Sequence, residues 1–175
     1  MMRLIIFINI NTINKSKGFT FIQLMVAIGI AGVLLAAAVP SFNLMMNNAR
    51  LEKASENFSS YLMWAKSKAD NGNAVYLSIT GGTNWCYGFN STAGCNCATS
   101  GSCEYLQIKS SEYSGITMTN NSGVTQLQFT SYSGTISSSL NVTFTNSDNI
   151  SITVNRNQIG TVTVCSDDIA HYSGC

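Results

Sequence analysis

The chain has 175 residues with a formal net charge of +1 at pH 7, and 45% of the residues are hydrophobic while 10% are charged. This length suits a single domain. From residue 74 to the C-terminus the basic residues Lys109 and Arg156 face the acidic residues Glu104, Glu112, Asp148, Asp167 and Asp168. The clustered positive charge that a general nucleic-acid-binding surface needs is therefore absent.

An uninterrupted apolar run covers residues 19–39 and ends at Pro40. At about 1.5 Å of rise per residue, a helix of this length crosses a hydrocarbon core of about 30 Å. Lys15 and Lys17 stand just before the run and favour a cytoplasmic N-terminus. The run predicts one transmembrane helix, followed by an exported domain after Pro40.

Residues 41–72 have the periodicity of an amphipathic helix. Pro40 removes one backbone donor, so it would kink the helix without necessarily ending it. Apolar residues recur at spacings of three, four or seven and form a stripe of Leu44, Leu51, Phe58, Leu62, Ala65 and Ala69. Asn71-Gly72-Asn73 then supplies a glycine cap and a stop signal.

The segment 73–175 alternates apolar and polar residues with a period of two, which is typical of strands. The expected strands are 74–80, 85–89, 105–109, 116–119, 124–130, 141–145, 150–155 and 158–165, with a tight turn at 155–158. Short connections favour antiparallel pairing. The predicted fold class is α+β, with a long kinked N-terminal helix packed on a C-terminal antiparallel β-sheet domain.

All cysteines follow the apolar run, and their even number predicts disulfides in an oxidising compartment; they are Cys86, Cys95, Cys97, Cys103, Cys165 and Cys175. We expect Cys165 to pair with Cys175, because they bound a short segment whose closure contributes about 2 to 3 kcal/mol in the chain-entropy model. The other cysteines would pair among themselves, with Cys95 to Cys97 the least favoured pairing. Zinc is the alternative for this group, but the Cys-x-Cys spacing differs from that of structural zinc sites.

Catalytic signatures are missing from the sequence. It contains neither a glycine-rich phosphate loop after a strand nor a His-Glu-x-x-His motif. Asp167, Asp168 and His171 stand close together and could be considered as a metal cluster or an acid–base pair. We favour a solvated surface loop, because a lone histidine beside acids needs further ligands. We therefore expect no enzyme activity, no cofactor and no metal.

The start of the apolar run carries a resemblance, in the segment Lys17-Gly18-Phe19-Thr20-Phe21-Ile22-Gln23-Leu24-Met25-Val26. It resembles the prepilin signature of type IV pilins and type II secretion pseudopilins, usually K-G-F-T-L-I-E-L-M-V. The resemblance implies that prepilin peptidase removes residues 1–18 by cutting between Gly18 and Phe19, and methylates the new Phe19 amine. Residues 19–40 would then form a transmembrane and filament-core helix. A secretory signal peptide and an unprocessed single-pass anchor are the alternatives, and neither explains a Gly-Phe junction after paired lysines.

One position departs from this signature. The family commonly has Glu at the fifth mature residue, where it is thought to neutralise the terminal amine of a neighbouring subunit, and here that residue is Gln23. A glutamine can hydrogen-bond an ammonium group but cannot cancel its charge. A carboxylate at mid-membrane depth costs about 2.5 to 3.5 kcal/mol and would be kept only for such a pairing. The change predicts a low-copy or tip-located subunit.

Later segments carry a second resemblance: 84–89, 95–97, 160–166 and 172–175 are similar to the GspH/FimT group of minor pilins, FimU-like members especially. In some members the segment matching Gly160 to Thr163 reads Gly-Arg-x-Arg and is linked to DNA binding during uptake. Here both arginine positions are threonines, Thr161 and Thr163. The strand is a degenerate form of that motif, so nucleic acid is not an expected partner.

These observations predict a minor pilin that enters a type IV pilus through its N-terminal helix, near the tip, and helps to initiate or cap assembly. The resemblance implies as partners the other major and minor pilins, the prepilin peptidase, the inner-membrane assembly platform and the inner membrane. It implies a single-pass inner-membrane protein with a periplasmic domain before assembly, and a pilus at the cell surface afterwards. A type II secretion pseudopilin and a DNA-uptake minor pilin are the alternatives.

Overall fold

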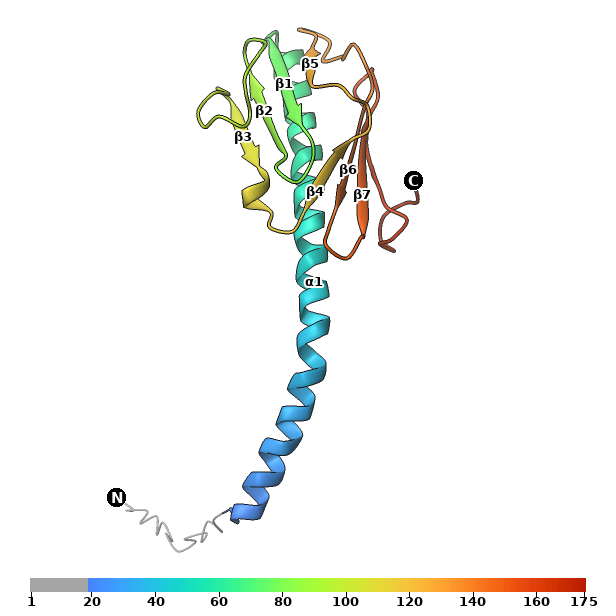
Figure 1. The fold of residues 1–175 in the computed structure, drawn as a ribbon. Coiled ribbons are helices and arrows are strands. Elements are labelled where there is room, and N and C mark those ends of the chain that lie inside the picture. The colour runs from blue at the N-terminus through green and yellow to red at the C-terminus, as the bar shows by residue number, and fades with distance from the viewer. Residues whose placement is uncertain (1–18) are drawn as a thin grey trace, which may run out of the picture. The chain divides into compact units, whose positions relative to one another are not determined.

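The computed structural model describes residues 19–175, with the backbone alone for residues 37–40. The described residues fall into two units that divide after Pro40, and the second comprises residues 41–175. One α-helix, α1 (Phe21–Asp70), contributes to both units, and Figure 1 shows it together with the strands of the second unit.

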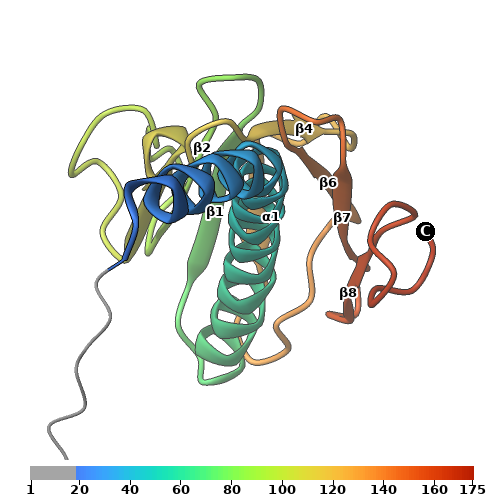
Figure 2. The same ribbon diagram turned by 90° about the horizontal axis from the view of Figure 1, so that it is seen from below.

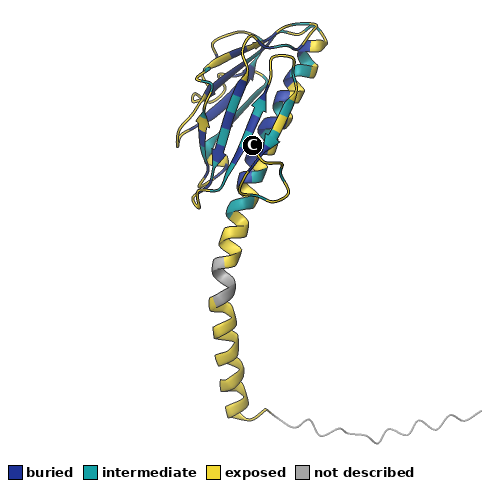
Figure 3. Cartoon of the chain, turned by 90° about the vertical axis from the view of Figure 1, so that its right-hand side faces the viewer, coloured by how far each residue is buried: buried dark blue, intermediate teal, exposed yellow. Residues whose placement is uncertain are grey.

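In the first unit, the described side chains of α1 are all exposed (Figure 3). They include large apolar residues such as Phe21, Leu24 and Val33. A window of α1 has a mean hydropathy of 2.5, so by length and composition this stretch suits a membrane-spanning helix. The helix continues through Pro40. The proline therefore does not end α1, and the kink predicted there stays a prediction.

In the second unit, one face of α1 is buried from Leu51 onward. The buried apolar residues of this face follow helical spacing and are Leu51, Ala54, Phe58, Leu62, Ala65 and Ala69. Leu44 was expected in the same stripe, and this expectation was wrong: its side chain is 46% exposed. The buried face begins only at Leu51, so Leu44 lies before the part of the helix that the strands cover.

The C-terminal end of α1 is closed by the predicted glycine cap. Gly72 has a φ of 86°, a conformation that glycine adopts without strain. Its N–H donates to Ala69 O at 2.9 Å, while the Asn73 N–H donates to Lys68 O at 3.4 Å. These two bonds form a Schellman motif, which satisfies carbonyl groups that the last helical turn leaves unpaired.

Eight strands follow, and they form two four-stranded sheets in which every pairing is antiparallel. The first sheet has the order β3-β2-β1-β5 and contains β1 (Val75–Thr80), β2 (Cys86–Asn90), β3 (Leu106–Lys109) and β5 (Gln126–Phe129). The second has the order β4-β6-β7-β8 and contains β4 (Thr117–Asn120), β6 (Leu140–Thr145), β7 (Ser151–Arg156) and β8 (Val162–Cys165). A short 3-10 helix (Ser110–Glu112) follows β3.

The α+β fold class is confirmed, with two sheets where the sequence suggested one. The division arises because β5 follows β4 along the chain but pairs with β1, with Leu127 opposite Leu77. A single bridge between Gly82 and Met118 connects the two sheets. Figure 2 shows strands of both sheets around the part of α1 that belongs to the second unit.

Phe58 of α1 is the point where the helix meets both sheets. Its ring lies 4.9 Å from that of Tyr87 in β2 and 5.6 Å from that of Phe144 in β6, both in edge-to-face geometry. Trp85 stacks on Tyr87 at 6.0 Å and donates its indole N–H to Ile116 O at 2.8 Å. One aromatic cluster thus holds the helix and both sheets together.

We expect Phe58→Ala to lower the free energy of unfolding by about 3 to 5 kcal/mol, because it leaves a cavity between the helix and two sheets. Denaturant unfolding of the full chain in non-ionic detergent, followed by near-UV circular dichroism, would measure the change. Met63→Ala on the same helix is the matched control, since Met63 is 52% exposed. Equal effects of the two substitutions would contradict the role given to Phe58.

Candidate functional site

The N-terminus of α1 carries a reciprocal cap. The Thr20 N–H donates to Gln23 Oε1 at 3.0 Å, and the Gln23 N–H donates to Thr20 Oγ1 at 3.3 Å. This is a capping box. Gln23 therefore uses its side-chain oxygen within its own helix. The Thr-x-x-Gln spacing was a readable signal for this cap, but sequence reasoning considered Gln23 only for its missing charge.

The expected processing site flanks this cap. Phe19, the expected mature N-terminus, is 90% exposed. Gly18 lies outside the described residues, as does the side chain of Pro40. Cleavage and methylation at this junction therefore stay predictions.

The cysteines of the second unit form three disulfides: Cys86–Cys97, Cys95–Cys103 and Cys165–Cys175. The first two cross-link the loop between β2 and β3, in a connectivity that the sequence left open. Gly88 is required beside them, because a Cβ there would overlap Cys103 Sγ. The third closes a loop at the C-terminus, between β8 and Cys175.

The C-terminal loop uses its acidic residues for local hydrogen bonds. Asp167 Oδ1 accepts from the Cys175 N–H at 2.9 Å, and Asp168 Oδ2 accepts from the Ser151 N–H at 2.9 Å. His171 points elsewhere, with Nε2 3.8 Å from Glu52 Oε1 of α1. Across residues 19–175, no cluster of three His, Cys, Asp or Glu side chains is arranged to hold a metal ion. The fold therefore directs these three side chains to different partners.

Tyr172 anchors the same loop to the helix. Its hydroxyl donates to Glu56 Oε1 at 2.9 Å. Burial and this acceptor raise the pKa of Tyr172 well above its usual value. The phenol therefore stays neutral and keeps its proton for the hydrogen bond at physiological pH.

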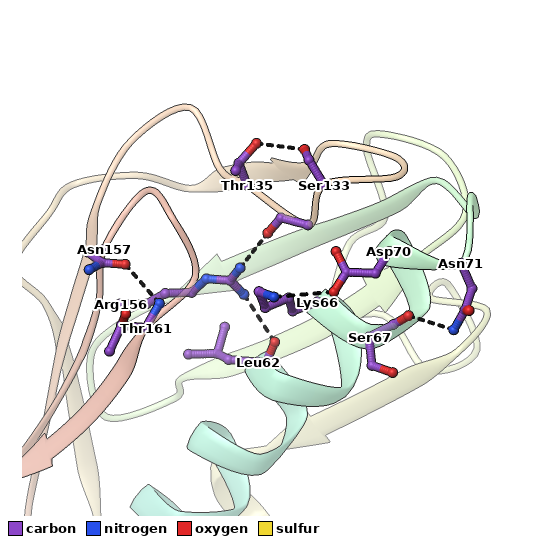
Figure 4. Close-up of polar contacts among 11 residues, drawn as sticks. Leu62, Lys66, Ser67, Asp70, Asn71, Ser133, Thr135, Arg156, Asn157 and Thr161 are labelled. Atoms are coloured by element: carbon purple, nitrogen blue, oxygen red, sulfur yellow. Dashed lines mark hydrogen bonds and ion pairs between the residues drawn. The ribbon is translucent and has the colours of Figure 1, made fainter.

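The turn before β8 lies later than the sequence suggested. The strand was expected over 158–165 and the turn over 155–158, but β7 continues to Arg156 and β8 begins at Val162. Asn157 closes the turn, because its N–H donates to Thr161 O at 3.1 Å while its Oδ1 accepts from the Thr161 N–H at 2.8 Å (Figure 4). Gly160 reverses the chain with a φ of 102°.

Thr161 and Thr163 are both exposed. Thr163 lies opposite Asn155 of β7. Asn155 also accepts a side-chain hydrogen bond from Asn141 of the neighbouring strand β6. The threonines at the arginine positions of the degenerate motif therefore present hydroxyl groups and no charge.

Arg156 is buried beside this turn, with 1% of its surface exposed. One guanidinium nitrogen donates to Leu62 O of α1 at 3.0 Å and another to Gly134 O at 2.6 Å (Figure 4). The group also lies 4.4 Å above the ring of Phe129. Burial lowers the pKa of Arg156 to about 10, which still leaves it charged at neutral pH. This cation is therefore committed to the interior and is not offered to a ligand.

A family model described as Type II transport protein GspH matches residues 54–172. The chain belongs to the GspH family. This confirms the resemblance found in the later segments, and it makes the chain a pilin-like structural component by family. The search of curated proteins and the search of solved structures find no match.

The match to the GspH family covers most of the second unit, including the turn at Gly160 and the strand with Thr163. It begins after the prepilin signature at residues 17–26. The signature and the family model are therefore two separate observations on different parts of the chain.

We expect this GspH-family chain to bind DNA weakly, because Arg156 is buried and Thr161 and Thr163 are uncharged. Mobility shifts of the full chain in non-ionic detergent, with duplex DNA at physiological salt, should show nothing tighter than the 10⁻⁴ to 10⁻⁶ M typical of non-specific binding. Submicromolar affinity would contradict this expectation.

The two positions can also be tested by adding the missing charges. The double change Thr161→Arg and Thr163→Arg should strengthen binding, because both side chains are exposed, and should steepen the salt dependence by about one unit per phosphate contact. The matched control changes both residues to Gln, which is also long and polar but carries no charge. An arginine variant that behaves like the glutamine variant would show that this strand is not accessible to DNA.

Proposed function

We propose that this chain is a low-copy minor pilin, which enters a type IV pilus through α1, near the tip, and helps to initiate or cap assembly. The observation that carries the proposal is the combination, in one chain, of a GspH-family unit and a helix whose described apolar side chains before residue 37 are all exposed. In the proposal, residues 1–18 form the leader, 19–40 the filament-core helix, 41–72 the amphipathic helix and 73–175 the globular domain.

The exposed helix supports an assembly role on physical grounds. Val33 is 72% exposed and Phe21 is 75% exposed, and further apolar side chains of the same stretch, such as Leu34, are exposed as well. Transfer of such surface out of water contributes about 25 cal/mol per Å². The helix is therefore stable only in a bilayer or among other apolar helices. A membrane-inserted subunit that later moves into a bundle of similar helices meets both conditions.

Gln23 supports the low copy number. Its side-chain oxygen accepts the Thr20 N–H, as a glutamate oxygen also would, but the amide carries no charge to pair with a neighbouring amine. A neutral amide also exerts no long-range attraction on a charged terminus. Addition of many such subunits in succession would lack the pairing that a carboxylate supplies.

A type II secretion pseudopilin is the second candidate, favoured by the description of the matching family model as a type II transport protein. It would share the apolar helix, the leader and the partners, which are other pilin-like subunits, the prepilin peptidase and the inner-membrane platform. The two candidates differ in whether the filament belongs to a type IV pilus or to a type II secretion system.

Deletion of the gene, with complementation, separates the two candidates. We expect loss of most surface pili by electron microscopy and normal secretion of proteins to the medium. Sheared pili from complemented cells should contain few copies of the chain, with methylated Phe19 at its N-terminus by mass spectrometry. Normal pili with lost secretion would support the pseudopilin instead, and an N-terminus beyond residue 39 would contradict both.

We expect Gln23→Glu to be tolerated and to increase incorporation, because Glu also suits the N3 position of a capping box and adds the carboxylate. Immunoblots of sheared filaments would report the number of copies per filament. Gln23→Leu is the control that removes both the cap and the polar group. Unchanged stoichiometry in the Glu variant would indicate that contacts of the second unit set the copy number.

A further inference from the structure

β8 is an edge strand of the second sheet, with β7 on one side. Figure 2 shows β8 at the margin of its sheet, with the C-terminal loop nearby. An edge strand leaves backbone N–H and C=O groups that can pair with another extended chain. The direction of these groups along β8 follows from its register with β7.

Residues paired across an antiparallel ladder alternate between hydrogen-bonded and non-hydrogen-bonded pairs. The Asn157 N–H bonds to Thr161 O, so Thr161 belongs to the bonded set, and two residues further Thr163 opposite Asn155 does as well. Val162 and Val164 are then the non-bonded positions, whose N–H and C=O groups point away from β7. Among the described residues, no backbone hydrogen bond from another segment reaches Val162, and none reaches the Val164 N–H.

The C-terminal loop already pairs with the outer edge of β8 at its C-terminal end, next to Cys165 and Ser166. The Ser166 N–H donates to Ser173 O at 3.0 Å, and Cys165 and Ser173 form a parallel bridge. This bond agrees with the alternation along β8, because Ser166 lies two residues beyond Val164 and its N–H also points away from β7. It also shows that a parallel chain fits beside β8. The loop covers the edge as far as the Val164 carbonyl and leaves the Val164 N–H and both backbone groups of Val162 open.

The edge strands β4, β5 and β8 each meet one flanking segment at an isolated bridge. β4 is bonded on its outer side by Gly82, whose N–H donates to Met118 O at 2.7 Å, and β5 is flanked by Ile136. β3 ends at Lys109, a residue type that discourages edge pairing. β8 contains no charged residue and no proline. Its edge is open at Val162 and at the Val164 N–H, with neither a charge nor a proline in the strand to discourage strand addition.

We propose that the outer edge of β8 binds an extended strand from another pilin-like subunit by main-chain pairing at Val162 and at the Val164 N–H. The free backbone groups require an extended peptide. Both valines pack partly on the core, so the added strand would place apolar side chains on that face and small polar ones beside Thr163. The uncharged edge fits such a peptide better than a phosphate backbone. The identity of the partner class rests on the proposed function.

The test uses the full chain in its own cells, with a photo-reactive benzoylphenylalanine in place of Thr163. We expect a cross-link to a peptide of another subunit that carries a prepilin signature, identified by mass spectrometry. Val164→Pro should reduce the cross-link about tenfold, because it removes the outward N–H and adds a ring that blocks pairing. Val164→Thr is the matched control, since it keeps the N–H and the branched shape.

Val164→Pro should leave the ladder with β7 intact, since the N–H that it removes points away from β7. Val162→Pro is the second variant if the first fails to fold, which circular dichroism of the purified chain would show. A cross-link that survives both prolines would overturn the proposal, and so would a cross-link to nucleic acid.

A second photo-reactive site at Val33 of α1 keeps the outcomes distinguishable. Cross-links to other pilin-like subunits from Val33 without any from Thr163 would reject the β8 edge while leaving the proposed function in place. Absence of cross-links from both positions would count against filament assembly itself. Cross-links from both, with loss only at Thr163 in the proline variants, would support the pairing.

Discussion

The burial of one helix face under two sheets is the constraint on which the second unit depends. The face combines large residues such as Phe58 and Leu62 with Ala54 and Ala65, and all four are fully or almost fully buried. The alanines allow strands to approach the helix closely, while Phe58 reaches one aromatic ring in each sheet. Neither sheet covers this face alone. Removal of the helix would leave both sheets with an open apolar side.

Polar links then connect the helix to segments far away in the sequence. Arg156 joins β7 to the backbone of α1 and to the loop before β6. Burying a guanidinium group without a directly bonded carboxylate is costly, so its two carbonyl acceptors make it a specific connection more than a strong one. Near the other end of the covered helix, the Asn146 side chain donates to Asn48 at 3.0 Å, and Asn47 donates to Asp148 at 2.9 Å. These contacts set the position of the second sheet along the helix.

The two units thus follow opposite principles. The second unit satisfies its apolar surface internally and closes its loops with disulfides, so it suits an oxidising compartment outside the cytosol. In the described part of the first unit, the backbone is satisfied by helical hydrogen bonds and by the cap of Thr20 and Gln23, while the described side chains of α1 are all exposed. A protein of this kind functions through what surrounds its helix, which agrees with a structural part in an assembly.

The sequence by itself determined the helix, its glycine cap at Gly72, the number and order of the strands and the family resemblance, because periodicity, turn residues and short motifs are local properties. Only the tertiary structure decided which strands share a sheet, since the pairing of β5 with β1 joins segments that are distant in the chain. It also decided the pairing of Cys86 with Cys97, which spacing alone left open. The burial of Arg156 is the clearest case. Its surroundings in the sequence are polar, and the carbonyl groups that accept its hydrogen bonds come from residues 62 and 134, which only the folded chain brings together.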